Sequence, residues 1–174
     1  FCLLLLCIIQ NSKAQVTDNF TDGDFTNNPT WVGGTGDWIV NPAFQLQSNN
    51  TIANSTYYLS SVNTLATSAQ WEFYCQLTFN PSAANYVDVY LTASASNITL
   101  SATTGYFVRI GNTDDEISLY RKDATGAAVK IIDGVNGILN SSSNVMKIKV
   151  FRNTANQWNL SRDLSGTGAS YFNE

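Results

Sequence analysis

Apolar residues recur at every second position along most of the chain. The run 71–79 shows this most clearly, because polar residues mostly separate the apolar ones. Its apolar positions are Trp71, Phe73, Cys75, Leu77 and Phe79. A period of two is that of a β-strand with one face buried and the other in solvent. Further runs of strand character occur at 38–40, 44–47, 57–60, 86–92, 106–110, 117–122, 127–132, 145–152 and 158–160.

Turn-forming residues separate these runs. Clusters of Pro, Gly, Asn, Asp and Ser lie at 80–82, 111–114, 124–126 and 133–134, and they supply positive φ angles or local side-chain capping. No segment has a sustained period of 3.6, and the Gly-rich stretch 33–36 is expected to be a loop. About ten short strands at this spacing predict an all-β fold, an antiparallel β-sandwich or jelly roll.

The first nine residues, Phe1–Ile9, form an apolar run. The run is too short to span a bilayer but suits the hydrophobic region of an export signal. Ser12 and Ala14 are small residues where a signal peptidase cuts, which predicts cleavage before Gln15. We therefore expect 1–14 to be a truncated signal peptide and the protein to be secreted or displayed at the cell surface.

The remaining segment, 15–174, is expected to be a single β-sandwich domain, an N-terminal fragment of a longer protein, with no membrane span in the mature chain. Cys75 is then its one cysteine. Because Cys75 lies in phase with the apolar positions of its strand, we expect a small buried hydrophobic side chain and not a reactive thiol.

The amino-acid composition excludes several classes of function. Charged residues make up 13% of the chain and the net charge is −4, so the polar surface must consist mainly of Asn, Ser and Thr. No Lys or Arg occurs between Ala14 and Val108, which argues against nucleic acid as a partner. The chain has no histidine, so it lacks the commonest general base and the preferred ligand of catalytic zinc. No Gly-rich phosphate loop occurs either. These absences favour a protein that is not an enzyme.

Two carboxylates could still form a glycoside hydrolase pair, for which a separation of about 5–10 Å in one groove is needed. Alternation leaves Glu72 and Asp88 as the plausible pair. The triplet Asp114, Asp115 and Glu116 lies in a turn that enters a strand and is expected to be solvated. A glycoside hydrolase-like sandwich is thus one alternative function.

An Asp-rich turn is a candidate calcium site. Asp22 and Asp24 flank Gly23, and Asp37 lies nearby in the sequence. Carboxylate and carbonyl oxygens are the ligands that Ca²⁺ prefers. Apart from this possible calcium ion, no cofactor is expected.

The strongest candidate for ligand binding is the face of the sheet out of phase with the core. Several predicted strands carry aromatic and charged residues there, and neighbouring strands would join them into one surface suited to a sugar or a peptide. The candidate ligand-binding residues are Tyr74, Asp88, Tyr90, Phe107, Arg109 and Tyr120. A recognition module that binds carbohydrate or peptide is therefore the leading hypothesis. The alternative is a structural spacer that packs against downstream domains of the same chain.

Several segments also resemble a known family. They are DNFTDGDF at 18–25, NPTW at 28–31, WEF at 71–73, FNPS at 79–82, GYFVRIG at 105–111, ISLYR at 117–121 and WNL at 158–160. Together they resemble the N-terminal domain of large surface proteins of gliding Gram-negative bacteria, the lamin-tail-domain or gliding-motility-associated proteins. The resemblance implies a concanavalin-A-like, laminin-G-like jelly roll in a multidomain exported protein. It implies no catalytic or binding residues.

Overall fold

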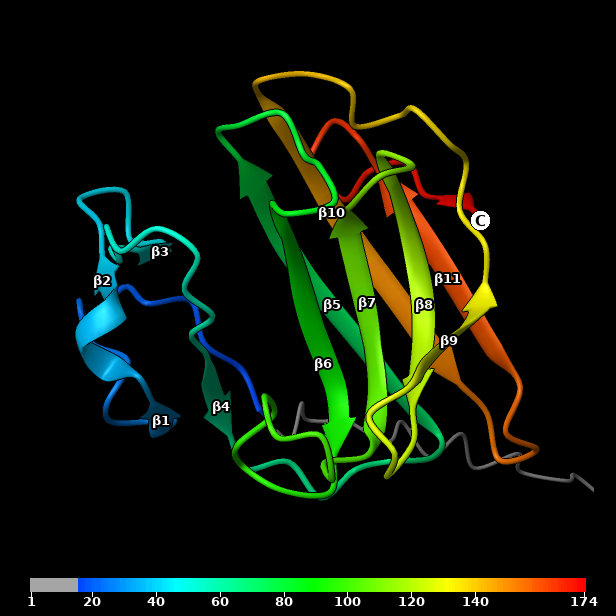
Figure 1. Ribbon diagram of the computed structural model, residues 1–174, viewed down its shortest axis with the longest axis horizontal. Helices are drawn as coiled ribbons and strands as arrows, with labels where there is room; N and C mark the ends of the chain where they lie inside the picture. Colours follow the sequence, from blue (N-terminus) through cyan, green and yellow to red (C-terminus); the bar gives the residue numbers. More distant parts are fainter. Residues whose placement is uncertain (1–15) are drawn as a thin grey trace, which may run out of the picture.

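The computed structural model describes residues 16–174, and these are built almost entirely from β-strands (Figure 1). The strands are β1 (Trp31–Gly33), β2 (Trp38–Val40), β3 (Leu46–Ser48), β4 (Leu59–Ser61), β5 (Ala69–Leu77), β6 (Tyr86–Ala93), β7 (Gly105–Gly111), β8 (Glu116–Lys122), β9 (Ala128–Ile132), β10 (Asn144–Arg152), β11 (Trp158–Asp163) and β12 (Phe172–Asn173). A single turn of 3₁₀ helix, η1 (Thr35–Asp37), precedes β2. The predicted signal peptide, 1–14, lies outside the described residues.

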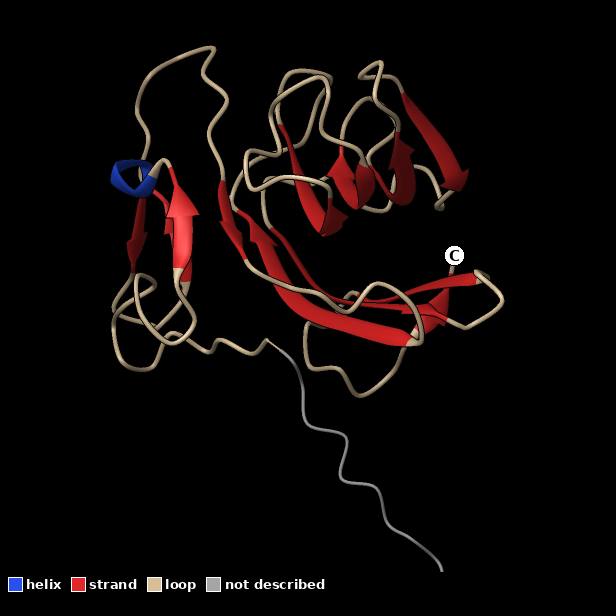
Figure 2. Ribbon diagram, turned by 90° about the horizontal axis from the view of Figure 1, so that it is seen from below, coloured by secondary structure: helices blue, strands red, loops and turns tan. Residues whose placement is uncertain are grey.

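Two four-stranded antiparallel sheets face each other (Figure 2). The front sheet has the order β6-β7-β8-β9, and the back sheet has the order β12-β11-β10-β5. The predicted all-β antiparallel sandwich is therefore confirmed, while the jelly-roll topology stays a prediction. Within residues 16–174 no helix has both the length and the apolar character that crossing a membrane requires.

Alternation places the core between the two sheets. The front sheet contributes Val108 and Leu119, and the back sheet contributes Ile148 and Leu160, all with no exposed surface. Cys75 packs against this core, and burial raises the pKa of its thiol to about 12. Cys75 therefore packs with the core as expected, but as a partly buried and not a fully buried side chain.

The sequence pattern predicted most strands to within about two residues, the usual uncertainty at strand ends. It missed β1 and β12, because strands of three and two residues are too short to show a period. The expected loop at 33–36 was wrong in part, since Gly33 ends β1 and Thr35–Asp37 form the 3₁₀ turn. The run 71–79 also begins and ends earlier than predicted, at Ala69 and Leu77.

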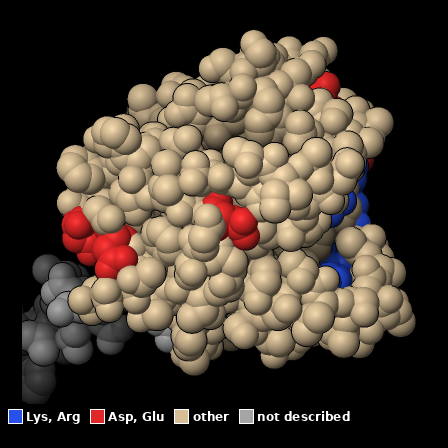
Figure 3. Space-filling model, turned by 60° about the vertical axis from the view of Figure 1, so that its left-hand side comes forward, with Lys and Arg blue, Asp and Glu red and all other residues tan. Residues whose placement is uncertain are grey.

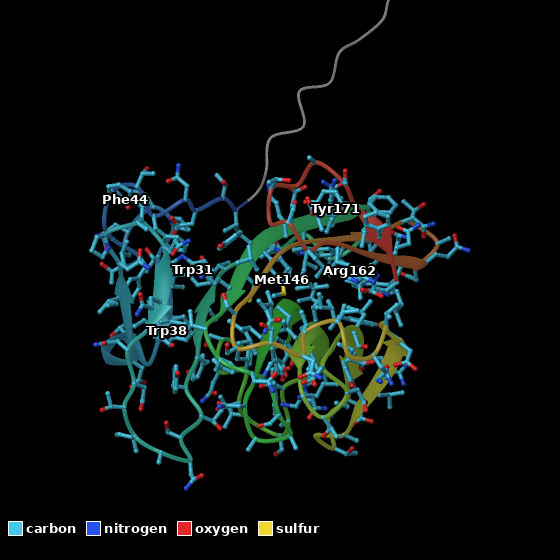
Figure 4. The ribbon with its side chains drawn as sticks, turned by 90° about the horizontal axis from the view of Figure 1, so that it is seen from above. Trp31, Trp38, Phe44, Met146, Arg162 and Tyr171 are labelled. Atoms are coloured by element: carbon cyan, nitrogen blue, oxygen red, sulfur yellow. The ribbon has the colours of Figure 1, made fainter. Side chains whose placement is uncertain are left out.

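Residues 16–66 form an N-terminal lobe beside the sandwich (Figures 1 and 2). Its two sheets have two strands each, β1-β4 and β2-β3. Trp31 and Trp38 lie within this lobe, apart from Met146 in the core of the sandwich (Figure 4). No residue of 16–66 is fully buried, and Ile52 and Val62 are 71% and 83% exposed. The lobe therefore has no core of its own.

Replacement of a core side chain tests the role of burial. Leu119→Ala should lower the free energy of unfolding by about 2–5 kcal/mol, because it removes buried methyl groups and leaves a cavity. The matched variant Val62→Ala, at an exposed position, should change it by less than about 0.5 kcal/mol. Urea denaturation of both variants measures the difference, and equal effects would contradict the assigned core.

Candidate functional site

The outer face of the front sheet gathers aromatic and charged side chains. Val87 and Val89 of β6 pack against the core, so Asp88 and Tyr90 between them point outward. Register extends this face across the sheet: Tyr90 pairs with Phe107 of β7, and Phe107 pairs with Tyr120 of β8. Together we call these residues the tyrosine–arginine face; they are Tyr86, Asp88, Tyr90, Phe107, Arg109 and Tyr120.

Three of these rings form a stack across the strands. The ring centroid of Phe107 lies 4.9 Å from that of Tyr90 and 5.3 Å from that of Tyr120, with interplanar angles of 24° and 9°. Phe107 is therefore only 1% exposed although its ring does not belong to the core cluster between the sheets. Because the rings cover one another's faces and side chains stand roughly perpendicular to a sheet, their edges point outward. The face presents ring edges and phenolic hydroxyls more than open ring faces.

Arg109 lies next to this stack and is held on several sides. Its Nε and Nη2 atoms donate to the two carboxylate oxygens of Asp88, each at 2.8 Å. Its guanidinium carbon lies 4.2 Å from the ring centroid of Tyr86 and 5.2 Å from that of Tyr120. Burial alone lowers the pKa of Arg109, but the hydrogen bonds and charge of Asp88 outweigh burial and the net pKa is raised. The cation is thus fixed in one orientation.

Some polar groups of this face are left for a ligand. Within residues 16–174, the hydroxyls of Tyr90 and Tyr120 and the Nη1 atom of Arg109 make no hydrogen bond, and none of these three atoms is buried. Burial raises the pKa of Tyr90 to about 12, with a further contribution from the charge of Asp88. Burial also raises the pKa of Tyr120. Both phenols therefore stay protonated at neutral pH and can donate as well as accept.

Five of the six predicted ligand-binding residues come together on this face, and Tyr74 does not. Tyr74 belongs to β5 of the back sheet, where its hydroxyl donates to Oε1 of Gln76 at 3.2 Å. Alternation shows which way a side chain points but not which sheet its strand joins. Tyr86 was missing from the predicted set although it has the same phase as Asp88 and Tyr90, and it is 40% exposed.

The two carboxylates considered for glycoside hydrolysis lie on opposite outer faces of the sandwich. Glu72 projects from the back sheet, where its Oε1 atom lies 2.8 Å from Nζ of Lys147. The hydrogen bond from Lys147 lowers the pKa of Glu72. Asp88 projects from the front sheet and pairs with Arg109. The core separates Glu72 from Asp88, so they do not share a groove.

The acidic triplet that leads into β8, with Glu116 as the first residue of the strand, is only partly solvated, and this corrects the expectation for Glu116. Glu116 is 3% exposed, because the pairing of β8 with β9 brings Lys130 beside it. Its Oε1 atom lies 2.6 Å from Nζ of Lys130 and accepts a hydrogen bond from Ser118 at 2.7 Å. The carboxylate of Asp114, in contrast, is 48% exposed.

The candidate calcium ligands are engaged in local hydrogen bonds. Asp22 accepts from the amide of Asp24 at 3.2 Å, and Asp37 accepts from the side chain of Asn50 at 2.6 Å. Hydrogen bonds, that of the Thr26 amide first, lower the pKa of Asp24 to about 2. Residues 16–174 hold no group of three or more His, Cys, Asp or Glu that could hold a metal ion.

Acidic side chains are visible on the side of the molecule that carries the lobe, whereas Lys and Arg are visible there only at one margin (Figure 3).

Comparison of the sequence with models of known protein families, with curated proteins and with solved structures found no match in any of the three. The resemblance to bacterial surface proteins therefore stays a prediction, and function has to be inferred from the geometry of this chain.

The packing of Tyr90 can be tested by titration. At about pH 11 its phenol should remain mostly protonated, because burial disfavours the phenolate, whereas an unperturbed tyrosine with a pKa of about 10 would be mostly ionised. The ¹³Cζ chemical shift of Tyr90, assigned with the variant Tyr90→Phe, reports its ionisation. A midpoint near the ordinary value would mean that the ring stack is open to water.

Proposed function

We propose that this chain is a non-catalytic recognition module of a secreted or cell-surface protein, and that it binds a glycan or an extended peptide on the tyrosine–arginine face. The observation that carries this proposal is the set of three polar groups left without partners on one rigid surface: the hydroxyls of Tyr90 and Tyr120 and the Nη1 atom of Arg109.

These groups suit a ligand rich in hydroxyl or carbonyl oxygens. Phenolic hydroxyls donate and accept, and a guanidinium donates only. The ring stack and the Asp88 carboxylate fix their positions before binding, which reduces the entropy that binding would otherwise cost. Tyr86, with 40% of its surface exposed, adds apolar area at the edge of the site. Tyrosine and arginine are also the residue types that dominate the energy of many interfaces.

A structural spacer is the second candidate function. It is favoured by the N-terminal lobe, in which no described residue is fully buried and Ile52 and Val62 are largely exposed. A spacer would cover these side chains with another domain of the same protein.

A binding screen separates the two candidates. Residues 15–174 would be applied to an array of glycans and short peptides, with and without calcium. If the tyrosine–arginine face binds, Tyr90→Phe and Tyr120→Phe should each weaken binding by about two- to tenfold, because each variant removes one neutral hydrogen bond and keeps the ring.

The control is Tyr74→Phe, which removes a tyrosine hydroxyl from the opposite sheet and should leave the affinity unchanged. Affinity that is the same in Tyr90→Phe, Tyr120→Phe and the wild type would place the ligand elsewhere. Failure of the wild type to bind any probe would favour the spacer.

A further inference from the structure

Two arginines occupy inward-facing strand positions at one end of the sandwich. Arg121 lies two residues after the buried Leu119 in β8, and Arg152 lies two residues after the buried Val150 in β10. Residues two apart on a strand point to the same face. Arg121 of the front sheet and Arg152 of the back sheet therefore point toward the space between the sheets, as the aliphatic core residues of the same strands do.

Register places these arginines among aromatic residues, in what we call the mouth of the sandwich. In the front sheet Tyr106 pairs with Arg121, and in the back sheet Arg152 pairs with Trp158. The rings of Tyr106 and Trp158 meet across the sheets with centroids 4.6 Å apart. The guanidinium carbon of Arg152 lies 5.0 Å and 4.9 Å from these two centroids. Figure 2 views the sandwich from this end.

A pocket of about 480 Å³ opens at the mouth. Its volume falls within the range of about 300–1,000 Å³ that is typical of small-ligand sites. The ends of β6, β7 and β8 line it, and its lining includes hydroxyl side chains, one ring and two cations. These residues are Thr92, Ser94, Thr104, Tyr106, Arg121 and Lys122. Asp123 also lines the pocket, and its carboxylate accepts hydrogen bonds from the amide and hydroxyl of Thr125 at 2.9 and 2.5 Å.

The cations at the mouth form no ion pair within 4.0 Å, although hydrogen bonds from Thr125 and, to a smaller extent, the charge of Arg121 lower the pKa of Asp123. Among residues 16–174, every Lys and Arg has a carboxylate oxygen within 4.0 Å except Arg121, Lys122 and Arg152. Lys122 donates to the carbonyl of Leu100 at 2.7 Å, and Arg152 donates to the carbonyl of Ala66 at 2.8 Å. The Nε atom of Arg152 is buried without a hydrogen-bond partner. Within residues 16–174, the positive charge that forms no ion pair is therefore concentrated at the mouth, in a chain whose net charge is −4.

We infer that the mouth is a binding site for an anionic saccharide. Arg121 takes the carboxylate or sulfate of the ligand, because a guanidinium matches the geometry of such groups. Lys122 lines the same pocket but lies in the opposite strand phase, so it adds positive charge at the rim. The hydroxyls of Thr92, Ser94 and Thr104 face the sugar hydroxyls, and Tyr106 supplies apolar surface for the ring. This site is distinct from the tyrosine–arginine face, since Tyr106 and Phe107 point to opposite sides of β7, and it does not depend on the function proposed for that face.

Calorimetric titration tests this assignment. The probes are a uronic-acid trisaccharide, a sulfated disaccharide, a neutral trisaccharide of similar size and a peptide of three glutamates. We expect the two anionic saccharides to bind and added salt to weaken them. Arg121→Gln should weaken them by about tenfold or more, the usual effect of losing a hydrogen bond to a charged group, and Arg121→Lys should retain part of the affinity.

Matched controls identify the site. Lys149→Gln removes the same charge from the outer face of the back sheet, where Lys147 still pairs with Glu72, and should leave the affinity unchanged. The pair Tyr90→Phe and Tyr120→Phe should also have no effect. The inference is overturned if no anionic saccharide binds, or if the neutral sugar or the glutamate peptide binds equally well. It is also overturned if Arg121→Gln binds like the wild type, or if either control weakens binding as much as Arg121→Gln does. Unchanged melting temperatures would show that the variants are folded.

Discussion

Burial of aliphatic side chains between the two sheets is the interaction on which the rest of the structure depends. The described residues hold one cysteine, which is free, so no disulfide joins the sheets and apolar burial must stabilise them. The same alternation that sends Val108 and Ile110 into the core sends Phe107 and Arg109 to the outer face. A rigid core on one side of the strands of the front sheet therefore fixes the position of the tyrosine–arginine face on the other side.

The sequence predicts features that depend on neighbouring residues better than features that depend on which strands pair. Alternation is local, so strand positions and outward-facing residues such as Asp88 and Tyr120 were predicted correctly. Sheet membership depends on which strands meet, and this put Tyr74 and Tyr90 on opposite sides of the sandwich. The burial of Glu116 depends in the same way on Lys130, which arrives from β9. The mouth was missed for another reason. Arg121 and Arg152 lie at inward-facing positions, where a charged residue in the sequence indicates that the buried part of the strand has ended.

The chain uses its few cations in two ways. Most of them compensate a carboxylate: Arg109 pairs with Asp88, and Lys147 pairs with Glu72. Such partly exposed pairs add little to stability but hold side chains in one orientation. The cations of the mouth are different, because backbone carbonyls satisfy some of their donors without cancelling their charge. Hydrogen bonding and charge balance are thus separate properties. At the mouth, hydrogen bonds satisfy some of the donors, and no ion pair balances the charge.

The position of the N-terminal lobe has a consequence for association between chains. β5 and β6 each end the order of their sheet, and the lobe stands beside the side of the sandwich that these two strands form (Figures 1 and 2). An open edge strand offers unpaired backbone groups to a strand of another molecule, and folded proteins commonly block such edges. The lobe occupies the approach that a foreign strand would need in order to extend either sheet at β5 or β6, so a segment without a core of its own can still limit strand addition on this side of the sandwich.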